Sequence, residues 1–268
     1  MKNQTLYDKI ESVLSYEKEL LDNDLIIDIP MPTHISSSEK LELIVKNRDV
    51  IPDSSMDEIQ NKASSKTIKN KKTNISSWQK SNSLDVLEYN INSCMNCVLG
   101  KTRKNFVFGT GNPKAKILII GEAPGADEDE QGKPFVGRAG KLLTKVIEAI
   151  ELKREDVYIA NIIKCRPPDN RKPLDDEVEQ CEPYLQKQIE LIDPEFILAL
   201  GLTAINTLLK KKHVMKESRG KLHEYHGRKL MVTYHPAALF RNPSWKKFVW
   251  KDVKNLRKMY DEYMEENK

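Results

Sequence analysis

The chain has 268 residues, of which 39% are hydrophobic, and a formal net charge of +4 at pH 7. Its length allows one well-buried core, and the lack of a long apolar run or a signal-peptide core excludes membrane-spanning and secreted classes. Residues 62–80 contribute six lysines and no acid, so the net charge is weak evidence for a polyanionic partner. We therefore expect a soluble, cytoplasmic protein.

The first 77 residues are predicted to lie outside the main domain. Apolar residues at helical spacing predict an amphipathic helix over residues 4–21, within an N-terminal extension that spans residues 1–45. Residues 46–77 are polar and contain too few apolar side chains to offset the entropy of ordering, which predicts a flexible linker. The apolar face of the helix suits docking on the core, pairing with another copy, or recruiting a protein partner.

The main domain is expected over residues 78–268, where short apolar runs alternate with helical patterns. In chain order we predict a helix at 83–92, a strand at 117–120, a helix at 141–151, a strand at 157–160, a helix at 175–192, a strand at 195–200, a helix at 203–210, a strand at 229–233 and a closing helix at 244–265. This order predicts an α/β fold, a three-layer α/β/α sandwich whose mostly parallel central sheet has about four strands.

Three of the predicted strands end in residues that can bind a ligand: Gly121–Gly125, Asn161 and His235. Ligands of parallel sheets bind beyond the carboxyl ends of the strands, so these ends are expected to form one site. The acids at 127–130 would repel a polyphosphate, and neither common phosphate-binding glycine motif is present. A neutral, flat ligand that stacks on Phe135 fits better, although a structural turn with a solvated acidic face is the alternative.

The chain contains four cysteines, and in an intracellular protein these indicate metal binding or catalysis more often than disulfides. Cys94 and Cys97 form a close pair, whereas Cys165 and Cys181 are separated by fifteen residues. Four thiolates suit either zinc or an iron–sulfur cluster, and the spacing does not choose between them. Unliganded core cysteines are the alternative. A site with four protein ligands has no open position, so we expect a structural metal.

Several motifs together indicate a family. They are the cysteine pair followed by Thr102-Arg103, GEAPGADED with KPFVGRAG, NIIKCRPPDNRKP, the spacing to Cys181, and YHPAALFRNP. Over about residues 84–265 the chain resembles the iron–sulfur, or family 4, uracil-DNA glycosylases. The resemblance implies a [4Fe–4S] cluster on Cys94, Cys97, Cys165 and Cys181. It also implies hydrolysis of the N-glycosidic bond of uracil flipped out of DNA, which leaves an abasic site for base excision repair.

The resemblance also implies how uracil is bound. Phe135 stacks on the base, and the Asn161 amide pairs with uracil N3–H and O4, discriminating against cytosine by ~1–3 kcal/mol for each group left unpaired. His235 donates to O2, where negative charge develops as uracil leaves. Backbone N–H groups near Glu122 and Ala123 contact the base.

Two features depart from other branches of the superfamily. Ala123 stands where several branches carry the aspartate that activates water, so Glu122 and Glu128 are the candidates to orient it. Gly125 stands where other branches place a tyrosine that blocks the thymine methyl group, which leaves the exclusion of thymine open.

The segment after His235 is expected to contact DNA. By position Leu239 matches the apolar wedge that replaces a flipped base, with Phe240 beside it and Arg241 placed for phosphate. Further predicted phosphate contacts are Lys164, Arg166 and Arg171. The alternative for Leu239 and Phe240 is that they begin the packing of the last helix.

The favoured function is thus a monomeric, monofunctional uracil-DNA glycosylase. One alternative is a catalytically inactive iron–sulfur module that binds DNA or serves replication, with the N-terminal helix recruiting a protein partner. Another is a zinc-stabilised nucleotide-binding α/β protein.

Overall fold

The computed structural model describes residues 77–267, and the predictions for the N-terminal extension and nearly all of the linker lie outside this range. Within the described part of the chain, no helix combines the length and the apolar character needed to cross a bilayer.

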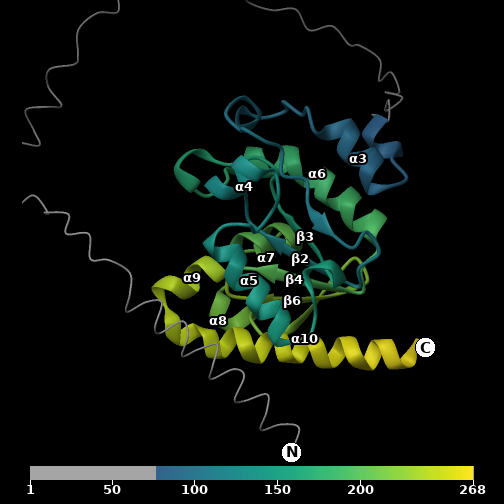
Figure 1. Cartoon of the computed structure of the whole chain (residues 1–268), viewed down its shortest axis with the longest axis vertical. Coiled ribbons are helices and arrows are strands. Elements are labelled where there is room, and N and C mark those ends of the chain that lie inside the picture. Colours follow the sequence, from purple (N-terminus) through teal and green to yellow (C-terminus); the bar gives the residue numbers. More distant parts are fainter. Residues whose placement is uncertain (1–76, 268) are drawn as a thin grey trace, which may run out of the picture. The chain divides into compact units, whose positions relative to one another are not determined.

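A mixed sheet of six strands forms the centre of the described part, in the order β1-β3-β2-β4-β6-β5 (Figure 1). Its four inner strands are mutually parallel: β3 (Tyr158–Asn161), β2 (Ile117–Gly121), β4 (Phe196–Leu200) and β6 (Arg228–Thr233). These are the four predicted strands, and the predicted α/β fold is confirmed.

Two antiparallel edge strands, β1 (Thr110–Gly111) and β5 (Leu222–Tyr225), were not predicted. β1 has only two residues, and in β5 only Tyr225 is buried, so neither produces an apolar run. β5 and β6 are joined by His226 and Gly227, both with positive φ, 49° and 78°. Such a pair matches the twist of a two-residue hairpin.

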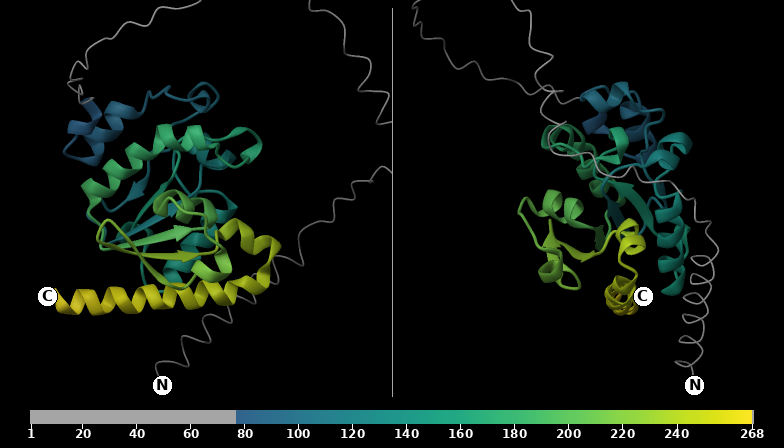
Figure 2. Two further views of the ribbon diagram at one scale, coloured as in Figure 1. Left: turned by 180° about the vertical axis from the view of Figure 1, so that it is seen from behind. Right: turned by 90° about the vertical axis from the view of Figure 1, so that its left-hand side faces the viewer.

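Helices cover both faces of the sheet. Strand β2 explains the division, because Ile117 and Ile119 point to one apolar cluster while Leu118 and Ile120 point to the other. The first cluster is closed by α5 (Arg138–Ala149) and α10 (Lys246–Glu266), and the second by α3 (Leu84–Ile91), α6 (Asp175–Ile192) and α7 (Leu202–Leu209). In the left view of Figure 2, the yellow α10 lies below the sheet and the green α6 above it. The three layers are therefore as predicted.

The helix boundaries follow ordinary end signals. Ser83 caps α3 by accepting a hydrogen bond from Val86 N at 3.3 Å, and three acids occupy the first turn of α6, where the helix dipole favours negative charge. The described residues also contain short 3₁₀ helices at Ser77–Lys80, Val98–Lys101, Arg154–Asp156, Pro168–Asn170 and Pro243–Trp245.

Three short helices were not predicted: α4 (Ala126–Gln131), α8 (Met215–Ser218) and α9 (Pro236–Arg241). The acidic run is the first turn of α4, where its charge complements the helix dipole. Asp129 is only 3% exposed and accepts hydrogen bonds from Lys104 N at 3.0 Å and Asn105 N at 3.3 Å. The alternative of a solvated acidic turn is therefore wrong at this residue.

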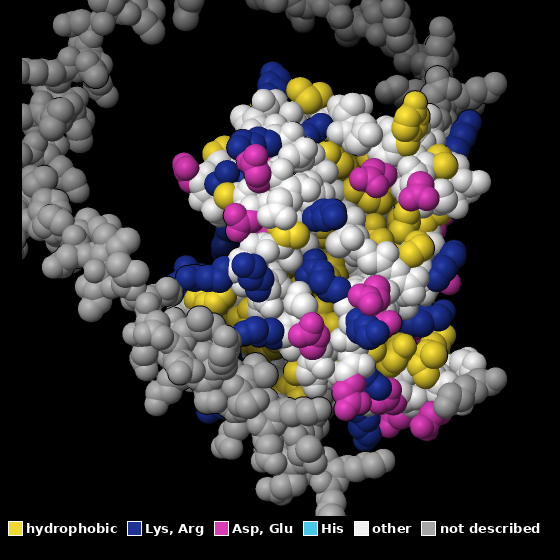
Figure 3. Space-filling model, viewed as in Figure 1, with side chains coloured by type: hydrophobic (Ala, Val, Ile, Leu, Met, Phe, Trp, Pro, Cys, Tyr) yellow, Lys and Arg dark blue, Asp and Glu magenta, His cyan; other side chains and the backbone are white. Residues whose placement is uncertain are grey.

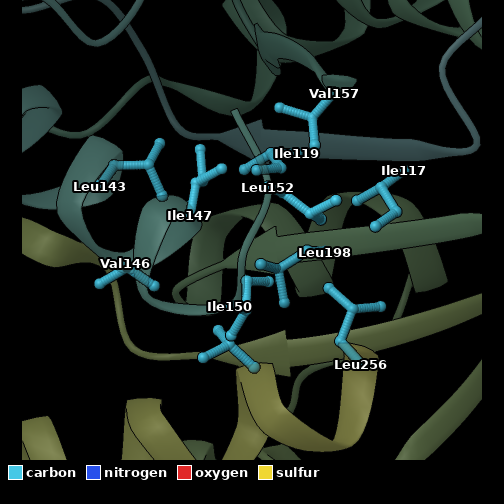
Figure 4. Close-up of a pocket in the computed structure, with 11 residues that line it drawn as sticks. Ile117, Ile119, Leu143, Val146, Ile147, Ile150, Leu152, Val157, Leu198 and Leu256 are labelled. Atoms are coloured by element: carbon cyan, nitrogen blue, oxygen red, sulfur yellow. The ribbon is translucent and has the colours of Figure 1, made fainter. Parts of the chain in front are cut away.

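A small apolar gap of about 10 Å³ remains between α5 and the sheet (Figure 4). Its lining is entirely hydrocarbon and includes Ile119, Ile147 and Leu198. A site with no polar partner does not hold water, so this is a packing gap rather than a binding site.

Candidate active site

Three predicted base-binding side chains, Phe135, Asn161 and His235, meet at one place. A Cβ atom added to Gly121, the last residue of β2, would lie 2.5 Å from Phe135 Cζ and 2.6 Å from Asn161 Oδ1. The rings of Phe135 and His235 lie 5.6 Å apart between centroids, tilted by 35°. An aromatic ring, a carboxamide and an imidazole therefore surround the carboxyl end of the sheet, as the sequence predicts.

Among the described residues, the side-chain amide of Asn161 has no hydrogen-bond partner. The residue is 1% exposed, and neither Oδ1 nor Nδ2 has a hydrogen-bond partner in the described part of the chain. A buried polar group left unpaired costs about 1–3 kcal/mol, and native proteins contain few of them. A ligand that offers one donor and one acceptor side by side would satisfy both atoms.

The ring of Phe135 is held by a strained backbone. Its φ of 53° lies in the left-handed region, which bulky residues rarely adopt. Glu128 fixes the segment on either side of it, because Oε1 accepts from Val136 N and Gly137 N, both at 2.9 Å, and Oε2 accepts from Gly125 N at 3.1 Å. Both oxygens of Glu128 thus shape this loop, and its predicted role of orienting water stays a prediction.

Two further contacts hold the same loop from outside. Arg154 donates to Pro134 O at 2.7 Å. A Cβ atom on Gly140 would lie 2.0 Å from the carbonyl carbon and oxygen of Phe135, so α5 approaches this backbone as closely as a glycine allows. The position of the ring is therefore determined by the loop and by the start of α5.

His235 presents a neutral imidazole with a defined tautomer. It is the N-terminal cap of α9, and Nδ1 accepts a hydrogen bond from Ala237 N at 3.2 Å, which places the ring proton on Nε2. Burial lowers the pKa of His235 to about 4, and the nearby Glu128 carboxylate opposes this shift only in part. At neutral pH the ring is thus an uncharged N–H donor.

Glu122, the other predicted candidate to orient water, is held by a hydrogen bond from α7. It is half-buried directly after β2, and its Oε2 accepts a hydrogen bond from Thr203 Oγ1 on α7. Ala123 beside it is half-buried against the cluster under α3, α6 and α7. Thr203 was not predicted, although its place just after the end of β4 was a signal for it.

The four cysteines lie in or against the same apolar cluster, and all four are free thiols. Three sulfurs accept hydrogen bonds: Cys94 from Tyr184 Oη at 3.4 Å, Cys165 from Arg103 Nη1 at 3.2 Å, and Cys181 from Lys164 N at 3.3 Å. Donors of this kind stabilise thiolates, and the residues that carry them tie the segment before β1 to β3 and α6.

Burial raises the pKa of the Cys181 thiol to about 12 and also raises the pKa of Cys165, although Arg103 opposes the shift at Cys165. Over residues 77–267, no three His, Cys, Asp or Glu side chains are grouped so as to hold a metal ion. In a four-iron cluster each thiolate binds a different iron, so its ligands need not surround a single point.

Two predicted DNA contacts are corrected by the structure. Lys164 is 0% exposed, with its ammonium bonded to Asn161 O and Gln188 Oε1, so it has no surface to offer a phosphate. Leu239 is 1% exposed within the core cluster under α5 and α10, as the packing alternative has it, and it is not placed to wedge into DNA.

The other predicted DNA contacts are at or near the surface. Arg241 is exposed, and Phe240 is half-buried, with the Arg138 guanidinium 4.1 Å from its ring centroid. Arg166 donates to Asn170 Oδ1 at 2.9 Å and keeps part of its surface. Arg171 is committed to a bidentate pair with the buried Glu177, at 2.7 and 2.9 Å. Figure 3 shows Lys and Arg interspersed with acidic residues on the face it presents.

The chain matches one family model and is similar to several proteins that share one name. Residues 108–257 match the family model described as the uracil DNA glycosylase superfamily. A type-4 uracil-DNA glycosylase of Saccharolobus solfataricus is 48% identical over 183 residues, which are 65% of this chain and 85% of that protein. Proteins of the same name from Archaeoglobus fulgidus and Thermotoga maritima are 45% and 39% identical, and the alignments cover 65% of this chain in both cases and 92% and 93% of those proteins.

Proposed function

Because the chain belongs to the uracil-DNA glycosylase superfamily, we propose that it hydrolyses the N-glycosidic bond of deoxyuridine in DNA and leaves an abasic site for repair. The observation that carries this proposal is the buried, unpartnered amide of Asn161, which shares a site with the ring of Phe135 and the imidazole of His235. Residues 78–268 are the glycosylase domain.

Asn161 reads the base. Its Oδ1 accepts from uracil N3–H while its Nδ2 donates to O4, and Phe135 stacks on the flat ring. Cytosine presents the opposite donor and acceptor pattern at these two atoms, so it leaves both amide groups unpaired at a cost of ~1–3 kcal/mol each. Neither amide atom has a hydrogen-bond partner in the part of the chain that the structure describes, which supports this role.

His235 stabilises the leaving group. As the glycosidic bond breaks, negative charge develops on uracil O2. The neutral imidazole of His235 can stabilise this charge by donating a hydrogen bond from Nε2–H to O2. The bond from Ala237 N to Nδ1 supports this tautomer. A preorganised donor to a developing oxyanion typically contributes ~10²–10³ in rate.

Glu122 orients the attacking water. Thr203 holds one carboxylate oxygen of Glu122 and leaves the second for a water molecule beside the sugar. The water adds to the anomeric carbon as uracil departs, and the proton it loses passes to solvent or to this carboxylate. Glu122→Gln should keep the bond to Thr203 and lower the rate of uracil release.

The four free cysteines fit a [4Fe–4S] cluster as four thiol donors within one apolar cluster, three of them with N–H or O–H donors directed at the sulfur. Cys94, Cys97, Cys165 and Cys181 would hold it. When bound, the cluster supplies a structural cross-link between the segment before β1 and the β3–α6 unit. Arg103 then compensates part of the thiolate charge.

Uracil-containing DNA is the partner, and Arg241, Arg166 and the Arg138–Phe240 pair are the phosphate and stacking contacts available at the surface. Flipping the base costs a few kcal/mol, which these contacts and the pocket must offset. Phe135, Asn161 and His235 come from one chain, so the site does not require a second copy, and we propose that the protein acts in the cytoplasm as a monomer.

The test is release of uracil from a defined oligonucleotide. Purified, metal-replete protein should produce alkali-labile sites at uracil but not at cytosine, and His235→Ala should lower the rate by ~10²-fold or more. A matched control is Lys187→Met, which removes a cation of α6 that pairs with Glu190. If neither single- nor double-stranded substrate is cleaved, the proposed function is wrong.

A further inference from the structure

Lys164 is a fully buried cation close to the base-reading amide. It is 0% exposed and is one of the largest fully buried side chains in the described part of the chain. Its ammonium donates to the main-chain oxygen of Asn161 at 2.9 Å and to Gln188 Oε1. Burying a charge is costly unless it is well hydrogen-bonded, so a position that needed only packing would be filled better by methionine or leucine.

These bonds belong to a longer chain of contacts. Gln188, also 0% exposed, donates through Nε2 to Phe108 O at 3.0 Å, and Val107 N donates to Lys164 O at 2.9 Å. Lys164 thus links the end of β3 to helix α6 and to the segment that leads into β1.

The linkage acts where the sheet stops. Gly121 and Asn161 are the last paired residues of β2 and β3, and the chain then turns toward Cys165. The side chain of Asn161 makes no hydrogen bond within residues 77–267, so the direction of its amide depends on how firmly its main chain is held. The Lys164 ammonium holds this main chain directly, at the carbonyl oxygen of Asn161.

We propose that Lys164 is a positioning residue for base recognition: it fixes the main chain of Asn161 so that the unpaired amide faces the pyrimidine. This inference rests on the proposed function. It gives the lysine a role away from DNA phosphates and makes Gln188 its support.

The test compares three variants with the wild type, each prepared to the same metal content. They are Lys164→Met, the double variant Lys164→Met/Gln188→Leu, and the control Lys187→Met, which lies beside Gln188 on α6. For each we would measure kcat and KM for uracil release, the Kd for free uracil, and the Tm. Lys164→Met should lower kcat and weaken binding of free uracil by about tenfold to a hundredfold, because the carbonyl of Asn161 loses its donor. KM for DNA should change by about twofold or less, since the proposed contacts to DNA phosphates come from surface arginines and not from Lys164.

The double variant tests whether the effect comes from the carbonyl of Asn161, and it is the second version to use if Lys164→Met does not fold. Lys164→Met leaves Gln188 Oε1 without its donor, whereas the double variant removes that atom but leaves Phe108 O without its donor. Asn161 O lacks its partner in both variants, so uracil binding and kcat should be equally low in both, whatever their Tm values. Lys187→Met should match the wild type in every measurement.

The inference is wrong if Lys164→Met keeps both kcat and the Kd for uracil within about twofold of the wild type, or if uracil binding and kcat recover in the double variant. Failure of the proposed function looks different, because the wild-type protein itself would then release no uracil.

Discussion

Gly121 allows the stacking ring and the base-reading amide to approach each other, and Gly121→Ala tests this directly. The new Cβ atom would lie 2.5 Å from Phe135 Cζ and 2.6 Å from Asn161 Oδ1, whereas ordinary contacts begin near 3.4 Å. Both side chains would therefore have to move by about 1 Å, or β2 would have to shift within the sheet. Overpacking of this kind typically costs about 1–3 kcal/mol of stability.

The effect on catalysis should be larger than the effect on stability. A displacement of about 1 Å at reacting or reading groups can lower a rate by about a hundredfold. We expect Gly121→Ala to lower kcat/KM for uracil release by about that factor, measured with a labelled oligonucleotide below the Tm of the variant. The affinity for free uracil should fall as well.

A matched control adds volume elsewhere in the sheet. Ala199 of β4 is fully buried against the helices of the opposite layer, so Ala199→Val should cost a similar amount of stability and leave uracil release nearly unchanged. If Gly121→Ala keeps wild-type kcat/KM, or if the control loses as much activity, the ring and the amide do not act together on the base and the reasoning is refuted.

Three further predictions test other parts of the site. Asn161→Asp should lose selectivity for uracil over cytosine, because one amide donor becomes an acceptor; unchanged discrimination in paired oligonucleotide assays would remove Asn161 from base reading. Because the pKa of His235 is lowered to about 4, the rate should stay level from pH 8 to about 5 and fall toward pH 4. The unfolded chain binds this proton near pH 6.5, so stability attributable to His235 should rise with pH between about 4 and 6.5, and a loss of rate centred near pH 6.5 would contradict the tautomer argument. Cys181→Ala should abolish visible absorbance and bound iron and lower the Tm, whereas full iron content in this variant would refute the proposed ligand set.

The four parallel strands could be predicted from the sequence because each is a buried apolar run bounded by turn residues. The edge strands could not, since β1 has two residues and β5 is mostly exposed. Helix α4 was missed because an acidic run has no apolar periodicity, and its stability comes from charge at the first turn and from Glu128 bonding back to Gly125. Helix α9 did carry a signal, proline at its first position.

The residues of the site also fall into those that the sequence predicted and those that it did not. Asn161 and His235 were found because they lie at or near strand ends, where topology alone brings residues together. Phe135 lies beyond the turn that follows β2, and it was found as an aromatic ring in that segment and through the family resemblance. Thr203 was missed because it lies 81 residues from the Glu122 it contacts, and its place just after the end of β4 was the signal that could have found it. Lys164 was mistaken for a phosphate contact because it stands in a basic segment, although the isoleucines before it, Ile162 and Ile163, were a sign of burial.

In the proposed complex, one pyrimidine binds between Phe135, Asn161 and His235 at the carboxyl end of the sheet. The most direct measurement is a crystal structure of the protein with free uracil. We predict uracil stacked on Phe135, both Asn161 amide atoms paired with N3–H and O4, and His235 Nε2 within hydrogen-bond distance of O2. Uracil bound at another place, or an Asn161 amide still unpaired beside it, would contradict the account.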